Sequence, residues 1–280
     1  MTFIAFLKKL RIQHRALPSF NVFNLETVQA VAAAASIKHC PVIIQVSEKA
    51  LAYAGFESLV TLIASVWNKT KLPLFLHLDH GKDLTVIKKC INSGFFTSVH
   101  IDASDQELSK NIKLTKKVVD WAHPKGVAVQ GELGTILGRE GYKKLMAEKK
   151  VVEVFTPLEQ IKEYIAQSGL DYLAVSIGNI HGNVKRSKGL DYARLKKIYQ
   201  ITNLPLVLHG GSGFSNSDLR RVRQLGVTVV NIDSDLRAAF LAGFAQGAKK
   251  TGVADPRVPL SLARDQMTRV AEAKINSLAF

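Results

Sequence analysis

The sequence predicts an α/β fold, a single-domain parallel (β/α)₈ barrel of the TIM type. Eight short, mostly apolar segments have the composition of buried parallel strands, and helix-like segments alternate with them along the chain. The length of 280 residues is ordinary for one such barrel. No Pro/Gly/Ser-rich tract or low-complexity run marks a linker, so we expect residues 1–280 to form one domain. A doubly wound open sheet is the alternative, but eight units without a domain break favour closure.

Each strand is expected where a short apolar run lies between turn-forming residues, and prolines 41, 73 and 205 directly precede three of these runs. The expected strands are 19–23, 42–46, 74–81, 98–102, 127–132, 172–177, 206–208 and 227–232. The expected helices are 3–10, 24–38, 56–68, 82–91, 105–123, one starting near 156, 191–201, 215–224, 233–248 and 261–274, with Asn24 available as a cap. A long charged segment, about 134–154, interrupts this alternation, and loops of such length at a functional face are often lids.

The composition bounds the partners and the compartment. A net charge of +15 is compatible with nucleic-acid or membrane-surface binding, but no nucleic-acid motif accompanies it and the aromatics are not interleaved with the lysines. We therefore expect a basic surface that attracts anionic metabolites. No apolar run approaches the roughly 18–20 residues that span a bilayer. Cys40 and Cys90 offer no disulfide framework and no secretion signal is evident, so we expect a cytoplasmic protein without nucleic-acid or membrane partners.

Three predicted strands end in a histidine that is followed by glycine: His80, His181 and His209. A lone histidine of this kind is more often a satisfied polar residue, but three at equivalent strand ends can converge at the barrel mouth. Three imidazoles with one open position are typical of catalytic zinc. Asp79 adjoins His80 at the same mouth, where a carboxylate beside a metal can act as general acid or base on a substrate hydroxyl.

Other strand-end residues suggest a second cation and a phosphate site. Asp102 and Glu132 could hold a further cation or orient the histidines. The glycine-rich segment 210–213 and the segment 231–234 follow the seventh and eighth strands, where barrel enzymes often bind phosphate. No predicted strand contains an interior lysine, so carbonyl activation is expected from a Lewis-acid metal rather than from a Schiff base.

Together these residues resemble the class II, metal-dependent ketose-bisphosphate aldolases, the family of fructose- and tagatose-bisphosphate aldolases. The resemblance covers nearly the whole chain. It rests on segments 19–22, 24–26, 45–48, 77–81, 132–134, 176–178, 181–182, 209–213 and 231–237.

The resemblance implies a role for each matching residue. His80, His181 and His209 would bind catalytic Zn²⁺, while Asp102 and Glu132 match a site for a second divalent or monovalent cation. Asp79 matches the acid/base at the C4 hydroxyl, and Glu140 matches a mobile glutamate that moves the proton at the dihydroxyacetone-phosphate carbon. The matching dihydroxyacetone-phosphate contacts are Ser47, Gly182, Gly210, Gly211, Ser212, Asn231, Asp233 and Ser234. The matching distal-phosphate contacts are Arg237 and Arg257, the latter from a neighbouring subunit of a homodimer or homotetramer.

The implied reaction is reversible aldol cleavage of a ketose 1,6-bisphosphate. Asp233 favours the fructose epimer, and tagatose 1,6-bisphosphate is the alternative substrate. The chain departs from the family on the expected lid, where Leu137, Arg139 and Gly141 flank Glu140 in place of more usual residues. Lys49 also replaces a frequent glycine. These departures motivate a second hypothesis, a non-catalytic phosphosugar-binding protein on the same fold.

Overall fold

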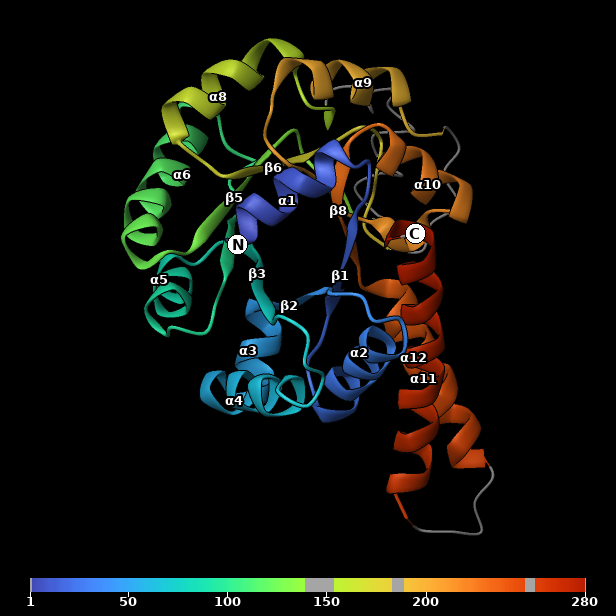
Figure 1. Ribbon diagram of the computed structural model, residues 1–280. Coiled ribbons are helices and arrows are strands. Elements are labelled where there is room, and N and C mark those ends of the chain that lie inside the picture. The colour runs from blue at the N-terminus through green and yellow to red at the C-terminus, as the bar shows by residue number, and fades with distance from the viewer. Residues whose placement is uncertain (1, 139–153, 183–188, 250–254, 280) are drawn as a thin grey trace.

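The computed structural model describes residues 2–138, 154–182, 189–249 and 255–279. Within them, parallel strands form a closed barrel in chain order, with β8 pairing to β1 (Figure 1). The strands are β1 Leu17–Asn21, β2 Ile43–Ser47, β3 Phe75–Gly81, β4 Ser98–Ile101, β5 Ala128–Leu133, β6 Tyr172–Val175, β7 Leu206–Leu208 and β8 Val227–Ile232. The predicted (β/α)₈ barrel is confirmed, because an open sheet would leave two edge strands unpaired.

The helices surround the barrel (Figure 1). They are α1 Phe3–Ile12, α2 Leu25–Ile37, α3 Glu48–Ala54, α4 Phe56–Trp67, α5 Leu84–Asn92, α6 Leu108–Ala122, α8 Ile161–Ser168, α9 Tyr192–Ile201, α10 Asn216–Gln224, α11 Ser234–Lys249 and α12 Arg257–Ala279. Short 3₁₀ elements are η1 His123–Lys125, η3 Leu158–Gln160 and η4 Gly211–Gly213. Asn24 caps α2, since its side chain accepts a hydrogen bond from the Thr27 N–H.

Helix α3 was not predicted from the sequence. It begins directly after β2 because the Ser47 side chain accepts a hydrogen bond from the Ala50 N–H at 3.2 Å. It ends at Gly55, whose φ of +80° suits glycine and allows the chain to turn into α4. This short helix places its first turn at the C-terminal end of the barrel, beside the residues discussed below.

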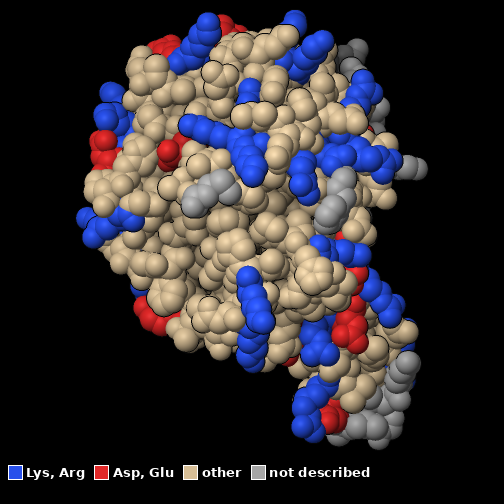
Figure 2. All heavy atoms as spheres, in the orientation of Figure 1, with Lys and Arg blue, Asp and Glu red and all other residues tan. Residues whose placement is uncertain are grey.

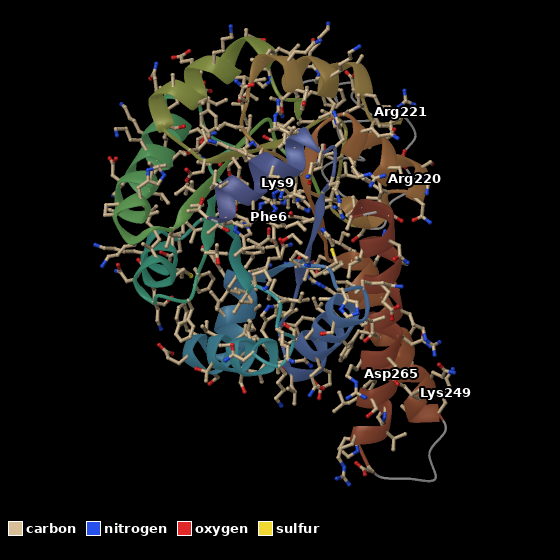
Figure 3. All side chains as sticks on the ribbon, viewed as in Figure 1. Phe6, Lys9, Arg220, Arg221, Lys249 and Asp265 are labelled. Atoms are coloured by element: carbon tan, nitrogen blue, oxygen red, sulfur yellow. The ribbon has the colours of Figure 1, made fainter. Side chains whose placement is uncertain are left out.

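Helices α11 and α12 form an antiparallel arm that projects from the barrel (Figure 1). Helix α12 is longer than the predicted 261–274, because Pro259 and Leu278 outside that range are also buried. Figure 3 shows Lys249 and Asp265 on this arm, away from the barrel axis. The outer part of the arm leaves Leu241 66% exposed.

The barrel interior has two zones. Helix α1 lies across the N-terminal end (Figure 1), where Phe3 and Leu7 pack on an apolar cluster formed by Leu17, Ile43, Ala128, Tyr172, Ala174, Val207 and Val229. The opposite, C-terminal end is filled by buried polar side chains, which are Asn21, Gln45, Asp79, His100, Gln130, Glu132, His209 and Asn231. Chemistry is therefore confined to one end of the barrel.

The face that carries α1 is dotted with lysine and arginine side chains rather than covered by one continuous basic stripe (Figure 2). Figure 3 places Lys9 on α1 and Arg220 and Arg221 on α10. Among the described residues, no single helix has the length and apolar composition to cross a membrane, and only the bent pair α3–α4 meets both criteria together.

Candidate active site

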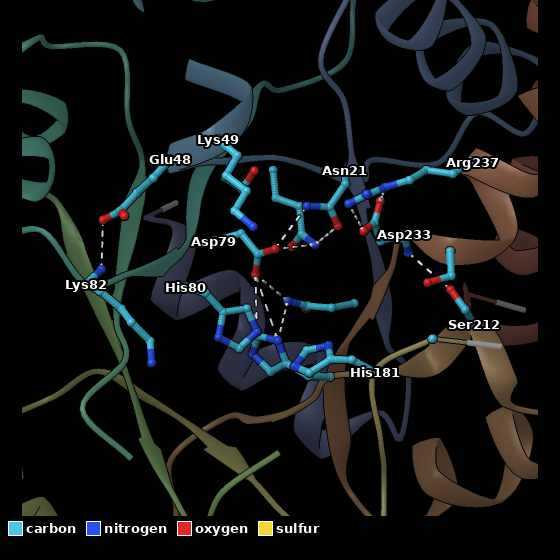
Figure 4. A pocket seen from close by; sticks show the side chains of 17 residues that line it. Asn21, Glu48, Lys49, Asp79, His80, Lys82, His181, Ser212, Asp233 and Arg237 are labelled. Atoms are coloured by element: carbon cyan, nitrogen blue, oxygen red, sulfur yellow. Dashed lines mark hydrogen bonds and ion pairs between the residues drawn. The ribbon is translucent and has the colours of Figure 1, made fainter. Parts of the chain in front are cut away.

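A cavity of about 460 Å³ opens at the C-terminal end of the barrel (Figure 4). The residues selected from the sequence that line it are Ser47, Asp79, His80, His181, Gly182, His209, Gly210, Ser212, Asn231, Asp233, Ser234 and Arg237. Asn21, Gln45, Glu48, Lys49 and Lys82 also line it, although the sequence analysis assigned them no role. Closure of the barrel thus brings together residues that are far apart in the chain.

The imidazoles of His80, His181 and His209 converge in this cavity. The ring centroids lie 4.3 Å apart for His80 and His209, 4.9 Å for His80 and His181, and 5.9 Å for His181 and His209. His80 Nε2 is buried and has no hydrogen-bond partner within the described part of the chain. Three neighbouring imidazoles, one of them with a buried nitrogen that makes no hydrogen bond, form a donor set that fits a divalent metal ion such as zinc.

Asp102 orients the His80 ring. Its Oδ2 lies 2.8 Å from His80 Nδ1, and its Oδ1 accepts a hydrogen bond from Ser104 Oγ at 2.8 Å. This contact leaves His80 Nε2 as the nitrogen available to a metal, in the carboxylate–histidine arrangement common at metal sites. This contact fits the orienting role considered for Asp102, and the closeness of its carboxylate to ligand atoms of His80, His100 and Glu132 also fits the other role, a cation site.

The histidine cluster favours one positive charge at a time. Burial alone would lower the pKa of His80, but the charge of Asp79 and the hydrogen bond that His80 Nδ1 donates to Asp102 together raise it to about 9. Burial and the nearby His80 lower the pKa of His181 to about 4, and they lower the pKa of His209 well below its usual value. A site that draws a proton to one imidazole and keeps two neutral has ligands ready for a cation.

Asp79 is held as a carboxylate by neighbouring amides. Asn21 Nδ2 donates to its Oδ2 at 2.9 Å, and Asn231 Nδ2 donates to its Oδ1 at 3.2 Å. Burial raises the pKa of Asp79, but the charge of His80 and the hydrogen bond from Asn21 outweigh it and leave the pKa lowered. An ionised carboxylate at the rim of a polar cavity can accept a proton from a substrate hydroxyl.

His209 is positioned by three amide side chains. Gln130 Nε2 lies 2.8 Å from its Nε2, Asn231 Nδ2 lies 3.1 Å from its Nδ1, and Asn179 Nδ2 donates to its backbone oxygen at 3.1 Å. A neutral imidazole has one acceptor nitrogen, so one of the two ring-facing amides turns its oxygen toward the ring. With Gln130 as that acceptor, Nε2 of His209 carries the proton and Nδ1 is unprotonated. Nδ1 lies beside Asp79, whose Oδ1 is 3.8 Å away.

The loop after β7 has the close packing of an anion-binding turn. Gly210 has a φ of +71°, and a Cβ there would lie 2.1 Å from the Ile180 carbonyl oxygen. Gly211 is equally constrained, since a Cβ would lie 2.3 Å from Val230 Cγ1. Ser212 Oγ accepts hydrogen bonds from two backbone N–H groups at the start of α11, both at 3.2 Å. The 16-residue helix α11 thus begins at the cavity, and helix N-termini favour anions such as phosphate.

Comparison with known proteins identifies the family of the chain. The family model for class II fructose-bisphosphate aldolases matches residues 1–279. The chain belongs to the class II fructose-bisphosphate aldolase family. It is 34% identical over 264 residues to a fructose-bisphosphate aldolase of Geobacillus stearothermophilus, covering 93% of this chain and 90% of that protein. It is therefore an aldolase, a carbon–carbon lyase, which favours the catalytic hypothesis over phosphosugar binding alone.

Solved structures agree with this assignment. The YdjI aldolase of Escherichia coli K12 superimposes with a TM-score of 0.85 at 28% identity, over 99% of this chain and 97% of that one. The fructose-bisphosphate aldolase of Campylobacter jejuni gives 0.83 at 23% identity, over 98% and 93%, which shows the shared fold.

One site residue expected of this aldolase, Arg257, lies elsewhere, and the structure does not describe another, Glu140. Arg257 does not line the cavity; it is at the start of α12, its side chain is 86% exposed, and it pairs with Asp255. Glu140 lies outside the described residues, as does most of the predicted lid 134–154. The base of that segment is described, and there the Leu137 carbonyl accepts a hydrogen bond from the His181 N–H at 2.8 Å.

The cations at the rim differ in how they are engaged. Arg237 forms a two-point ion pair with Asp233, so both residues assigned to substrate currently contact each other. Lys82 pairs with Asp105 at 3.3 Å. Burial lowers the pKa of Lys82, but nearby carboxylates, Asp102 foremost, outweigh it and keep the pKa raised, which disfavours a Schiff-base role. Lys49 points into the cavity (Figure 4), and its ammonium has no hydrogen bond or ion pair within the described structure.

Two buried side chains lie beneath the cavity: Glu132, which the sequence analysis selected, and His100, which it missed. Glu132 is buried, and burial with the charge of Asp102 raises its pKa to about 8. Beside it lies His100, also buried, and ligand atoms of His80, His100, Asp102 and Glu132 all lie within 4.8 Å of one another. Period-two alternation along strand 98–102 places His100 on the same face as Asp102, and this signal could have found it.

Proposed function

We propose that this aldolase depends on zinc and cleaves fructose 1,6-bisphosphate to dihydroxyacetone phosphate and glyceraldehyde 3-phosphate. The observation that carries the proposal is the convergence of His80, His181 and His209 beside the ionised Asp79. The three histidines would hold the metal, which when bound supplies a Lewis acid that polarises the substrate carbonyl.

The protein's own groups position the sugar and move its protons. The phosphate of the dihydroxyacetone half would lie against the backbone of residues 210–212 and the N-terminus of α11. Asp79, fixed by Asn21 and Asn231, would take the proton of the C4 hydroxyl. The C3–C4 bond then breaks and C4 becomes the aldehyde carbon. The electron pair of the broken bond remains with C3, in the dihydroxyacetone half. By the family resemblance, Glu140 would return a proton to C3.

The fructose epimer is supported by the name of the Geobacillus relative and by Asp233 at the rim. A coupled assay for dihydroxyacetone phosphate, run with fructose and tagatose 1,6-bisphosphates side by side, tests this preference. A higher kcat/KM for the tagatose epimer would reverse the substrate assignment while leaving the aldolase reaction intact.

Zinc dependence has a separate test. A strong chelator should abolish cleavage, zinc should restore it, and borohydride with substrate should leave the activity unchanged because no Schiff base forms. Cleavage at full rate by protein shown to be metal-free would refute the metal-dependent mechanism.

We further propose a homodimer or homotetramer in which Arg257 serves a neighbouring site. Its position on α12, away from its own cavity and 86% exposed, supports this arrangement. Light scattering after gel filtration tests the assembly. Mixing Arg257→Ala with an inactive Asp79→Asn chain tests the sharing, since restored activity requires residues from both subunits.

A further inference from the structure

Strand β3 carries a bulge at the residues that enter the cavity. β3 and β4 are in register up to Leu78 and again from Gly81. Between these points two residues of β3, Asp79 and His80, face only His100 on β4. Two residues opposite one is the defining feature of a β-bulge, which re-aims side chains near active sites.

The bulge solves a problem of side-chain direction. In a regular strand, adjacent side chains point to opposite faces, so Asp79 and His80 could not both face the cavity. His80 instead has a φ of +48°, in the left-handed region that residues other than glycine seldom adopt. Both side chains consequently line the same cavity (Figure 4).

The bulge also removes the His80 N–H from the strand ladder, and a side chain replaces the lost acceptor. The His80 N–H donates to Nδ1 of His100 at 3.3 Å. The His100 side chain is fully buried, and its ring centroid lies 4.9 Å from that of His80 and 5.2 Å from that of His209. The His100 ring therefore lies next to two proposed metal-binding imidazoles, those of His80 and His209.

The hydrogen bond assigns the tautomer of His100. A neutral imidazole that accepts at Nδ1 carries its proton on Nε2. That Nε2 faces Glu132 Oε2 at 3.8 Å, and neither atom has a hydrogen-bond partner within the described structure. A protonated Nε2 cannot bind a metal, so His100 is excluded as a ligand despite its closeness to the cluster.

We propose that His100 is a positioning residue for the metal site: it accepts the His80 N–H and thereby holds the bulge that turns Asp79 and His80 into one cavity. The proposal rests on the proposed metal site but not on the identity of the sugar. No role for this residue follows from the family resemblance stated above.

Two substitutions distinguish the role of the hydrogen-bond acceptor of His100 from that of its ring. His100→Leu keeps an apolar side chain of similar bulk without an acceptor, whereas His100→Asn places Oδ1 near the position of Nδ1. We expect His100→Leu to weaken zinc binding by about tenfold or more, as loss of an orienting partner typically does. His100→Asn should stay within about threefold of the unsubstituted protein. Zinc affinity is measured by competition with a chromophoric chelator, and the visible spectrum of the cobalt-loaded protein reports ligand geometry.

His77→Leu is the matched control. His77 is likewise buried in the barrel on β3, but its Nδ1 contacts Ser98 Oγ at 2.9 Å and the Tyr172 hydroxyl at 3.1 Å. We expect this substitution to lower the melting temperature and leave zinc affinity unchanged. Equal losses of affinity in His77→Leu and His100→Leu would mean that general destabilisation, not the hydrogen bond, weakens the site.

A measurement on the unsubstituted protein covers the case in which His100→Leu does not fold. Nitrogen NMR of the zinc-loaded protein should show a scalar coupling across the hydrogen bond from the His80 amide to an unprotonated His100 Nδ1. A protonated Nδ1, or loss of a whole equivalent of bound zinc in His100→Asn, would overturn the proposal by making His100 a ligand. If the protein binds no divalent metal, both the positioning role of His100 and the proposed zinc mechanism are refuted. Slow cleavage with normal metal binding would count against the substrate assignment alone.

Discussion

The two ends of the barrel interior are built from the same strands but differ in almost every other respect. At the N-terminal end, α1 presses Phe3 and Leu7 onto an apolar cluster that excludes water. At the C-terminal end, the interior is filled by amides, imidazoles and carboxylates in mutual contact. The N-terminal end stabilises the fold, whereas the C-terminal end buries polar groups, which costs free energy, in an arrangement suited to catalysis.

This contrast explains why the site tolerates unusual features. A left-handed backbone at His80 and a buried carboxylate at Asp79 are unfavourable in isolation. They persist with hydrogen bonds from neighbouring strands: the His80 N–H donates to His100, and the Asp79 carboxylate accepts from two amide side chains. Substitutions at the two ends should therefore have opposite signatures, in catalysis at one end and in stability at the other.

The largest expected effect on turnover is at Asp79. Asp79→Asn keeps the size of the side chain and an acceptor oxygen for one of its two amide donors, Asn21 and Asn231, but cannot accept a proton, so kcat should fall by about 10²–10⁴-fold. The coupled assay measures kcat, and elemental analysis checks that zinc remains bound. Asp105→Asn, at an exposed carboxylate paired with Lys82, is the control and should keep its kcat.

The next largest effect at the polar, C-terminal end is expected on zinc affinity as the pH changes. In the metal-free protein His80, with a pKa of about 9, holds a proton that zinc must displace. Zinc affinity should then rise about tenfold per pH unit between pH 7 and 9 and level off above that. Calorimetry in buffers of different ionisation enthalpy would detect the released proton. Binding without proton release would contradict the assigned charge state.

The same pKa predicts a change in stability. The folded value of about 9 lies above the ordinary value of 6.5, so protonation of His80 stabilises the metal-free fold. That contribution is complete below pH 6.5 and disappears as the pH rises through 9. Melting temperatures of metal-free protein across this range measure it, and zinc-loaded protein should lack the effect.

A smaller effect, on KM, is expected at Lys49. Because its ammonium is not engaged by another described residue, it is available to the distal phosphate of the substrate. Lys49→Met should raise KM for fructose 1,6-bisphosphate by about tenfold, with less effect on fructose 1-phosphate. Lys82→Met, which removes a rim cation already paired with Asp105, is the matched comparison. Equal changes for both sugars would show that Lys49 does not recognise the distal group.

The smallest effect on catalysis is expected at the apolar end. Leu7 is fully buried, so Leu7→Ala should lower the free energy of unfolding by about 2–5 kcal/mol through lost contacts and a cavity. Denaturant unfolding measures this loss, while kcat of the remaining folded enzyme should stay unchanged. A large fall in kcat would show that the two ends are not independent.

Prediction from sequence succeeded where the signal is local. Strands β7 and β8 occur at the predicted positions 206–208 and 227–232, because short apolar runs bounded by turn residues specify buried strands. The strand-end histidines were recognisable for the same reason. Helix α3 was missed although its Ser47 cap is a local signal, because the helix is only seven residues long; the bulge in β3 was missed because it depends on how β3 pairs with β4.

By itself, the sequence determined the alternation of buried strands with helices and the polar strand ends, because apolar pattern and chain punctuation are properties of neighbouring residues. Only the tertiary structure decided that Asp102 orients His80, that His100 supports it from β4, and that Arg257 lies away from its own cavity. These relationships join segments that are distant in the chain. Their geometry exists only once the barrel has closed and the bulge has set the direction of each ring.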